Sequence, residues 1–123
     1  MNITVAESVL MKLLWARSPQ PSEALVADLG PSQDWSETTI RTLLSRLVKK
    51  GMVAADHAEG RRFLYRPLVS QADYLHAESK GLIERLFDGQ LGPFVAQFSE
   101  REKLTAEDVA QLKRLISEFE DGE

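Results

Sequence analysis

The sequence predicts a mainly α protein that begins with three short helices and a β-hairpin and continues as a helical segment. Apolar residues recur at three- and four-residue spacing before residue 50, which is the period of amphipathic helices. Two β-favouring runs follow, residues 52–57 and 63–67, with a glycine-containing turn between them. Helical periodicity then returns. Three helices followed by a hairpin is the order of elements in a winged helix-turn-helix.

The first two helices are predicted from their caps and breaks. Thr4 and Glu7 match the S/T-x-x-E capping box, in which each side chain accepts a hydrogen bond from the other residue's backbone N–H. A helix is therefore expected over residues 5–17. Ser22 stands where it would cap a short second helix over residues 23–29, and the Gly-Pro pair that follows would end this helix.

The third helix is the most informative segment, because one side is apolar and the other is polar and cationic. Ser36 occupies the N-cap position and Gly51 the C′ position. At about 100° per residue, the apolar side chains share one face: Ile40, Leu43, Leu44 and Leu47. Hydroxyls and cations, which hydrogen-bond base edges and phosphates, lie on the other side. The DNA contacts predicted on this helix are Thr38, Thr39, Arg41, Thr42, Ser45, Arg46 and Lys49.

The turn of the hairpin would place two further cations, Arg61 and Arg62, at the tip of a wing, where they would contact phosphates or a minor groove. Ser22 could offer the N-terminus of its helix to a phosphate. Lys50 is expected either to contact a phosphate or to be a solvated helix cap. Arg46 is expected to contact a phosphate, with pairing to an acidic neighbour as the alternative.

The C-terminal segment shows three helical stripes. Ser70 caps the first, Asp88-Gly89 ends it, and Thr105–Asp108 opens the last. Such stripes cannot all be buried by the helices folding back on one another in so thin a layer. The helices could pack on the first domain, but an acidic helical tail after a winged helix more often forms a dimer. The segment is therefore predicted to be a helical dimerisation domain over residues 69–123, after a winged-helix domain over residues 1–68. The predicted dimer contacts are Leu75, Leu82, Ile83, Leu86, Phe87, Phe94, Phe98, Val109, Leu112, Ile116 and Phe119.

Charge is distributed unevenly along a chain whose net charge is -4. Residues 36–67 carry seven Lys and Arg against three Asp and Glu, so this middle region is positive while the remainder is acidic. A local positive surface attracts a polyanion even when the whole protein is negative. The sequence therefore favours a nucleic-acid partner for the middle region.

Composition makes an enzyme improbable. The chain contains no cysteine and no glycine-rich phosphate loop, and its two histidines lie far apart in the sequence. Asp73 and His76 share a helix face and could form half of a metal site, but a surface hydrogen bond is the commoner outcome for such a pair. No cofactor and no metal are expected. No apolar run is long enough to insert into a membrane and no signal peptide is evident, so a cytoplasmic location is expected.

Three stretches carry a family resemblance that spans nearly the whole chain. The run from Asp34 to Gly51, the first-helix residues Ala6-Glu7 with Leu13-Leu14-Trp15, and the run from Gln97 to Thr105 together resemble the BlaI/MecI/CopY penicillinase-repressor family. The resemblance implies a dimeric transcriptional repressor with an N-terminal winged helix. It also implies binding to a short inverted repeat in a promoter.

The resemblance further implies how repression ends. In the β-lactam branch of the family, a membrane sensor metalloprotease sets off proteolysis within the dimerisation domain, at an Asn-Phe pair. The matching positions here are Gln97 and Phe98, so the first residue of the pair differs. The copper-responsive branch uses a Cys-x-Cys hook, which this chain lacks.

Two alternative functions remain open at this stage. A winged-helix regulator could be released by a small-molecule effector in a pocket lined by Phe87, Phe94 and Phe98. A winged helix can also serve as a protein-interaction module, although exposed apolar anchors would then be expected in place of the cationic face.

Overall fold

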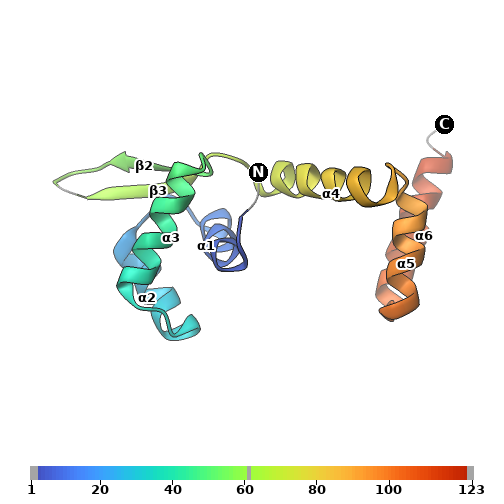
Figure 1. The fold of residues 1–123 in the computed structure, drawn as a ribbon, viewed down its shortest axis with the longest axis horizontal. Helices are drawn as coiled ribbons and strands as arrows, with labels where there is room; N and C mark the ends of the chain where they lie inside the picture. The colour runs from blue at the N-terminus through green and yellow to red at the C-terminus, as the bar shows by residue number, and fades with distance from the viewer. Residues whose placement is uncertain (1–2, 61, 122–123) are drawn as a thin grey trace. The chain divides into compact units, whose positions relative to one another are not determined.

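The computed structural model describes residues 3–60 and 62–121 (Figure 1). The chain forms two compact units, Met1–Glu78 and Ser79–Glu123. The first unit contains the winged helix and the first turns of helix α4 (Gln71–Phe87), and the second contains the rest of that helix and all that follows.

Helix α1 (Val5–Ala16) begins with the predicted capping box. The backbone N–H of Glu7 donates to Thr4 Oγ1 at 3.1 Å, and the backbone N–H of Thr4 donates to Glu7 Oε1 at 2.7 Å. These two bonds satisfy donors that the first turn of a helix otherwise leaves unpaired. The helix ends one residue before the predicted boundary, so the prediction for this segment is confirmed.

Helix α2 (Ser22–Gln33) departs from the sequence prediction at both ends. Pro21 is its N-cap residue and Ser22, which is buried, is the first helical residue, so the predicted serine cap is wrong. The helix also continues through Pro31 and ends only at Asp34, whose φ of 57° is left-handed. Proline removes one intrahelical donor, a small loss in the last turn, because the helix continues for only two residues beyond it.

Helix α3 (Glu37–Lys49) has the caps that the sequence predicts. Ser36 Oγ accepts from the backbone N–H of Thr39 at 3.1 Å. At the other end, the backbone N–H of Gly51 bonds to the carbonyl of Val48 and that of Met52 to the carbonyl of Leu47, both at 3.0 Å. This pair of bonds is a Schellman motif, and the φ of 78° at Gly51 is the left-handed conformation that it requires.

The wing is a three-stranded antiparallel sheet of order β1-β3-β2. Strands β2 (Val53–His57) and β3 (Phe63–Pro67) form the predicted hairpin, with His57 opposite Phe63. The two-residue strand β1 (Gln20–Pro21) pairs with β3 and was not predicted. Strand β1 is part of the segment that joins α1 to α2. Its pairing with β3 therefore fixes the base of the wing to these helices.

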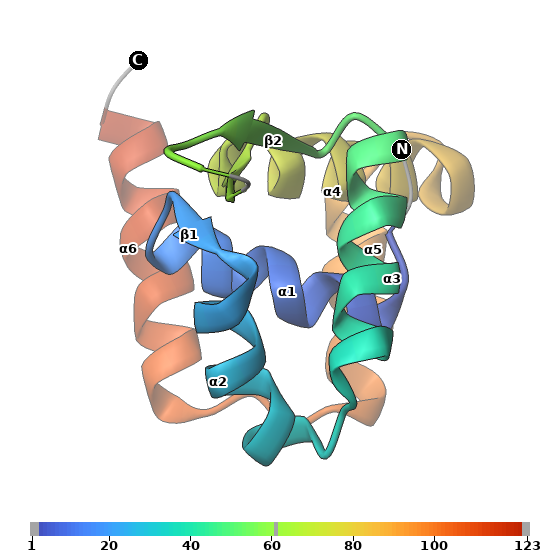
Figure 2. The same cartoon turned by 90° about the vertical axis from the view of Figure 1, so that its left-hand side faces the viewer.

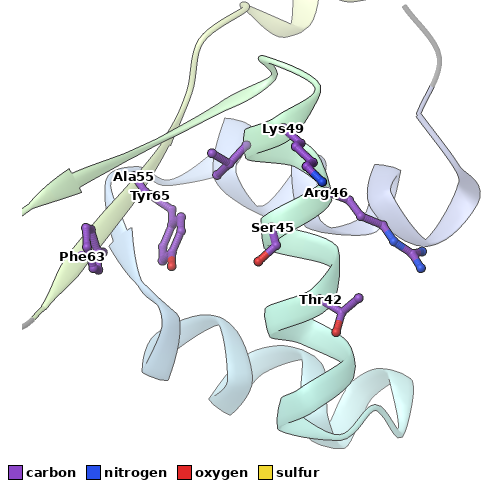
Figure 3. Close-up of a pocket in the computed structure, with 8 residues that line it drawn as sticks. Thr42, Ser45, Arg46, Lys49, Ala55, Phe63 and Tyr65 are labelled. Atoms are coloured by element: carbon purple, nitrogen blue, oxygen red, sulfur yellow. The ribbon is translucent and has the colours of Figure 1, made fainter.

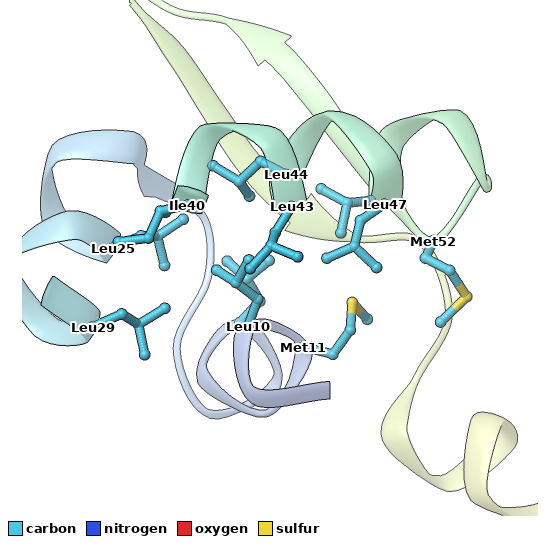
Figure 4. Close-up of a cluster of buried hydrophobic side chains, with 11 residues drawn as sticks. Leu10, Met11, Leu25, Leu29, Ile40, Leu43, Leu44, Leu47 and Met52 are labelled. Carbon is cyan, nitrogen blue, oxygen red and sulfur yellow. The ribbon is translucent and has the colours of Figure 1, made fainter. Parts of the chain in front are cut away.

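The core of the first unit lies between its three helices (Figure 4). Figure 2 shows α1 lying across the space between α2 and α3, with the sheet at one end of the three helices. Trp15 is at the edge of this core: its indole N–H donates to the carbonyl of Val69 at 2.8 Å and its ring packs against Tyr74. The buried apolar residues are Leu10, Met11, Leu14, Leu25, Leu29, Ile40, Leu43, Leu44, Leu47, Met52 and Val53.

Helices α4, α5 (Leu91–Arg101) and α6 (Ala106–Asp121) contain no fully buried residue among those described. Ser70 caps α4 through a 3.0 Å bond from the backbone N–H of Asp73, and Thr105 and Asp108 form a reciprocal cap at α6, both as predicted. In the second unit, Phe94 lies 5.4 Å from Phe87 and 6.3 Å from Phe98, measured between ring centroids. The remaining apolar side chains of these helices lie exposed or half-buried, and Tyr74 in the first turn of α4 packs on the core of the first unit.

Candidate nucleic-acid interface

The outer face of α3 carries the polar residues that the sequence assigned to it. The apolar face of the helix is buried in the core, which turns Thr38, Thr42 and Ser45 to the solvent together with Arg46 and Lys49. Figure 3 shows Thr42 and Ser45 projecting from this helix, with β3 across from them. Burial of one stripe thus fixes the orientation of the other, and the predicted recognition face is continuous in the structure.

Several cations near this face are held by carboxylates. Arg41 pairs with Glu37 at 3.2 Å, one helical turn apart, and Arg62 lies 3.7 Å from Glu23. Both pairs are exposed, so each contributes little to stability and can open when a phosphate or base is present. In contrast, Arg46 and Lys49 have no ion-pair partner among residues 3–60 and 62–121. The predicted alternative of an acidic neighbour for Arg46 is therefore not seen in this part of the chain.

Lys50 forms an ion pair that the sequence did not predict. Its Nζ lies 2.6 Å from Glu7 Oε1, and the Glu7 side chain has no solvent exposure. The predicted solvated cap is wrong, because the half-buried side chain turns inward to neutralise a buried carboxylate. The phosphate contact of Lys50 stays a prediction. Burial raises the pKa of Glu7, but the hydrogen bonds from Lys50 and Thr4 and the charge of Lys50 outweigh it, so the pKa is lowered overall.

Two other predicted contacts have particular surroundings. The hydroxyl of Thr39 lies 3.0 Å from that of Ser36, so Thr39 is part of the helix cap although its side chain is exposed. Ser22 is the first residue of α2 and is only 8% exposed. Arg61 lies outside the described residues. Arg66, a further cation of β3, pairs with Asp56 at 2.7 Å across the hairpin.

A groove separates α3 from the wing and has a volume of about 480 Å³. From α3 it is lined by Thr42, Ser45, Arg46, Val48 and Lys49, and from the wing by Ala55, Phe63 and Tyr65. In Figure 3 the Tyr65 ring and the Ser45 hydroxyl point into the space between helix and strand. The sequence analysis missed Phe63 and Tyr65. Their two-residue spacing, which places them on one face of a strand, is the signal that could have found them.

A second, smaller hollow of about 320 Å³ lies beside the first, around the Arg62–Glu23 pair. It is lined by Ser22, Glu23, Arg41, Arg62, Phe63 and Tyr65. Tyr65 and Phe63 belong to both hollows, so the outer surface of the wing is continuous with that of α3.

The predicted dimer contacts and the predicted cleavage position lie on exposed or half-exposed surface. Leu112, Ile116 and Phe119 of α6 are 37%, 58% and 78% exposed. Gln97 and Phe98 lie in the last turns of α5, and both are exposed. The structure contains one copy of the chain, so the dimer contacts remain predictions.

The described residues form neither a metal site nor a membrane-spanning helix. In the described part of the chain, no three His, Asp or Glu side chains are grouped so that they could hold a metal ion. No helix among the described residues has the length and apolar character needed to cross a membrane.

Comparison with known proteins identifies the family. The family model described as "Penicillinase repressor" matches residues 3–118. A penicillinase repressor from Bacillus licheniformis is 33% identical over 117 residues, which covers 95% of this chain and 91% of that protein. The methicillin resistance regulatory protein MecI from Staphylococcus aureus strain N315 is 28% identical over 116 residues, covering 94% of each chain.

A solved structure agrees with the fold. The solution structure of the DNA binding domain of the repressor BlaI has a TM-score of 0.54 and 38% sequence identity, covering 59% of this chain and 88% of that one. The winged-helix prediction is therefore confirmed. The family is one of repressors and not of enzymes, which confirms the prediction that the chain is no enzyme. The chain belongs to the penicillinase repressor family.

Proposed function

We propose that this chain is a dimeric, sequence-specific DNA-binding repressor that occupies a short inverted repeat in a promoter. The observation that carries the proposal is the outer face of α3, on which hydroxyls and cations are exposed while the opposite stripe is buried. Membership of a repressor family and the likeness to the BlaI DNA binding domain support a DNA-binding repressor. A cytoplasmic location follows from such a partner.

Base reading is assigned to residues near the N-terminal half of α3. The N-terminal part of a recognition helix reaches base edges in the major groove. Arg41 is our candidate for a bidentate contact with guanine, and it would leave Glu37 to make this contact. Thr38 and Thr42 each offer a hydroxyl and a methyl group, which suit base edges and thymine methyls. Arg46, Lys49 and Arg62 are assigned to phosphates.

The dimer is supported by the exposed apolar surface of α4, α5 and α6. A chain that leaves side chains as large as Phe119 mostly in water has apolar area that a second copy would bury. A two-fold dimer would place its recognition helices in successive major grooves, roughly 34 Å apart, which is why the operator should be close to a palindrome.

Release from the operator is proposed to follow a signal that acts on the C-terminal helices. In the family resemblance that signal is proteolysis by a membrane sensor metalloprotease. The matching pair, Gln97-Phe98, is exposed, which suits cleavage, but it lies inside helix α5, so the helix would have to open locally before a protease could bind it. Incubation of the full chain with such a protease, followed by mass spectrometry, would test this position.

The experiment that tests the proposed function is selection from a pool of randomised duplexes by the full chain, at about 150 mM salt so that non-specific binding is weak. We expect recovery of a short inverted repeat with two equivalent half-sites. Recovery of a single half-site would contradict the dimer. Recovery of no sequence above background would contradict DNA binding and favour a protein-interaction module.

A further inference from the structure

The groove between α3 and the wing combines features that folding does not explain. Phe63 is 40% exposed and Val48 is 39% exposed, and both line the groove. Phe63 and Val48 are not part of the buried core, and they are not among the partly buried residues that pack on it. Tyr65, in contrast, is partly buried and packs on the core. Single exposed apolar residues are ordinary on protein surfaces, but these two line the same hollow, Val48 from α3 and Phe63 from β3.

The groove also holds hydroxyl donors between the apolar side chains. Ser45 and Thr42 project from the helix, and the Tyr65 ring extends toward them from β3 (Figure 3). No Asp or Glu is among the described residues that line it. The rim carries Arg46 and Lys49, which have no ion-pair partner in the described part of the chain.

Phe63 is held in place by its neighbour on the opposite strand. His57 is its register partner, and their ring centroids lie 4.4 Å apart with an interplanar angle of 40°. A ring that is already ordered by such a contact loses little conformational entropy when a ligand packs on it. The aromatic side of the groove is therefore preorganised before any partner arrives.

Apolar surface, hydroxyl donors and a cationic rim match the sugar–phosphate backbone of DNA, whose sugars are apolar and whose phosphates accept hydrogen bonds. A recognition helix in the major groove and a wing beside it leave one strand to pass between them. We propose that this strand lies in the groove, with a deoxyribose packed on Phe63 and a phosphate oxygen accepting from the hydroxyls of Tyr65 and Ser45. This inference rests on the proposed function and adds two wing residues to its interface.

The test uses the full chain and two fluorescein-labelled duplexes, the inverted repeat recovered by selection and a mixed-sequence duplex of equal length. Tyr65→Phe removes one hydrogen bond to a charged group and keeps the ring, so we expect about tenfold weaker binding, measured by anisotropy. Phe63→Ala should weaken binding to a similar degree. Because backbone contacts carry no sequence information, both duplexes should lose affinity by similar factors.

Leu68→Ala is the matched control. Leu68 is a comparably exposed apolar residue that follows β3 but does not line the groove, so its loss should leave binding unchanged. Replacing single phosphates of the recovered duplex by neutral methylphosphonates locates the contact. At the linkage that Tyr65 contacts, the losses from the neutral linkage and from Tyr65→Phe should not add.

The outcomes separate this inference from the proposed function. If the wild-type chain binds neither duplex, DNA binding itself is wrong and this inference falls with it. If the wild-type chain binds while Tyr65→Phe and Phe63→Ala bind equally well, the groove does not hold the strand. Circular dichroism and thermal unfolding of each variant confirm that a loss of binding comes from a folded protein.

Discussion

The ammonium group of Lys50 lies 2.6 Å from Oε1 of Glu7, a carboxylate with no solvent exposure. The same oxygen accepts from the backbone N–H of Thr4, 2.7 Å away. One buried carboxylate therefore connects the N-terminal cap of α1 to the C-cap residue of α3. The end of the recognition helix is thereby fixed to the first helix of the domain by charge as well as by packing.

Replacing Lys50 by Met should destabilise the fold by about 3 kcal/mol, the lower end of the range for breaking a buried ion pair. The variant leaves the carboxylate of Glu7 buried and charged. The lower end of the range applies because the Lys50 side chain is 34% exposed and is therefore less desolvated in the folded protein than Glu7. Urea unfolding measures this difference. Lys49→Met, at the exposed neighbouring position, is the control and should change stability by less than about 0.5 kcal/mol. Equal midpoints for the two variants would contradict the role assigned to Lys50.

The ion pair should also make stability depend on pH in a predictable direction. The pKa of Glu7 in the folded protein lies below its usual value of 4.5. A lowered pKa means that the unfolded chain takes up the proton first as the pH falls, so the stabilisation is complete above about pH 4.5 and is lost as the pH falls through the folded pKa.

Glu7→Gln isolates this effect, because glutamine cannot titrate. The difference in unfolding free energy between wild type and Glu7→Gln should be largest near about pH 7 and shrink toward about pH 3. Urea titrations of both proteins at several pH values provide the measurement. A difference that stays constant over this range would show that the carboxylate is not the titrating group.

Arg41→Ala should reduce affinity for the selected inverted repeat by about 1–3 kcal/mol per contacted base and relax the sequence preference there. The mixed-sequence duplex should lose much less, because a base contact does not contribute to non-specific binding. Glu37→Gln is an informative companion, because it removes the exposed partner of Arg41 without removing the guanidinium. Equal losses on both duplexes would identify Arg41 as a phosphate contact.

Ile116→Asp should convert the dimer to a monomer at micromolar concentration, because it places a charge in the apolar stripe of α6 that we assign to the interface. The residue is 58% exposed in the single chain, so the fold of the monomer should persist. Analytical ultracentrifugation reports the mass, and circular dichroism the helix content.

Ala110→Asp is the matched control for this variant. It adds the same charge at an exposed position on the other side of α6, so the dimer should remain. Dissociation by both substitutions would point to general repulsion and not to an apolar interface. Persistence of the dimer in Ile116→Asp would contradict the assignment of this stripe.

The sequence by itself determined the features that depend on neighbours within one or two helical turns. The capping box of Thr4 and Glu7, the Schellman end at Gly51 and the stop of α4 at Asp88-Gly89 all follow from residues a few positions apart. The buried stripe of α3 also follows from periodicity, and it fixed the recognition face, because burying one side exposes the other.

Only the tertiary structure decided the features that join distant segments. Strand β1 consists of two residues and exists because β3 offers it hydrogen-bond partners, so no local pattern marks it. The sequence around Lys50 is equally typical of a solvated helix cap. Its actual partner, Glu7, is 43 residues away in sequence and comes within hydrogen-bond distance only in the folded chain. The groove likewise forms only when α3 and β3 are brought together, and a surface made by two elements cannot be seen in the sequence of either.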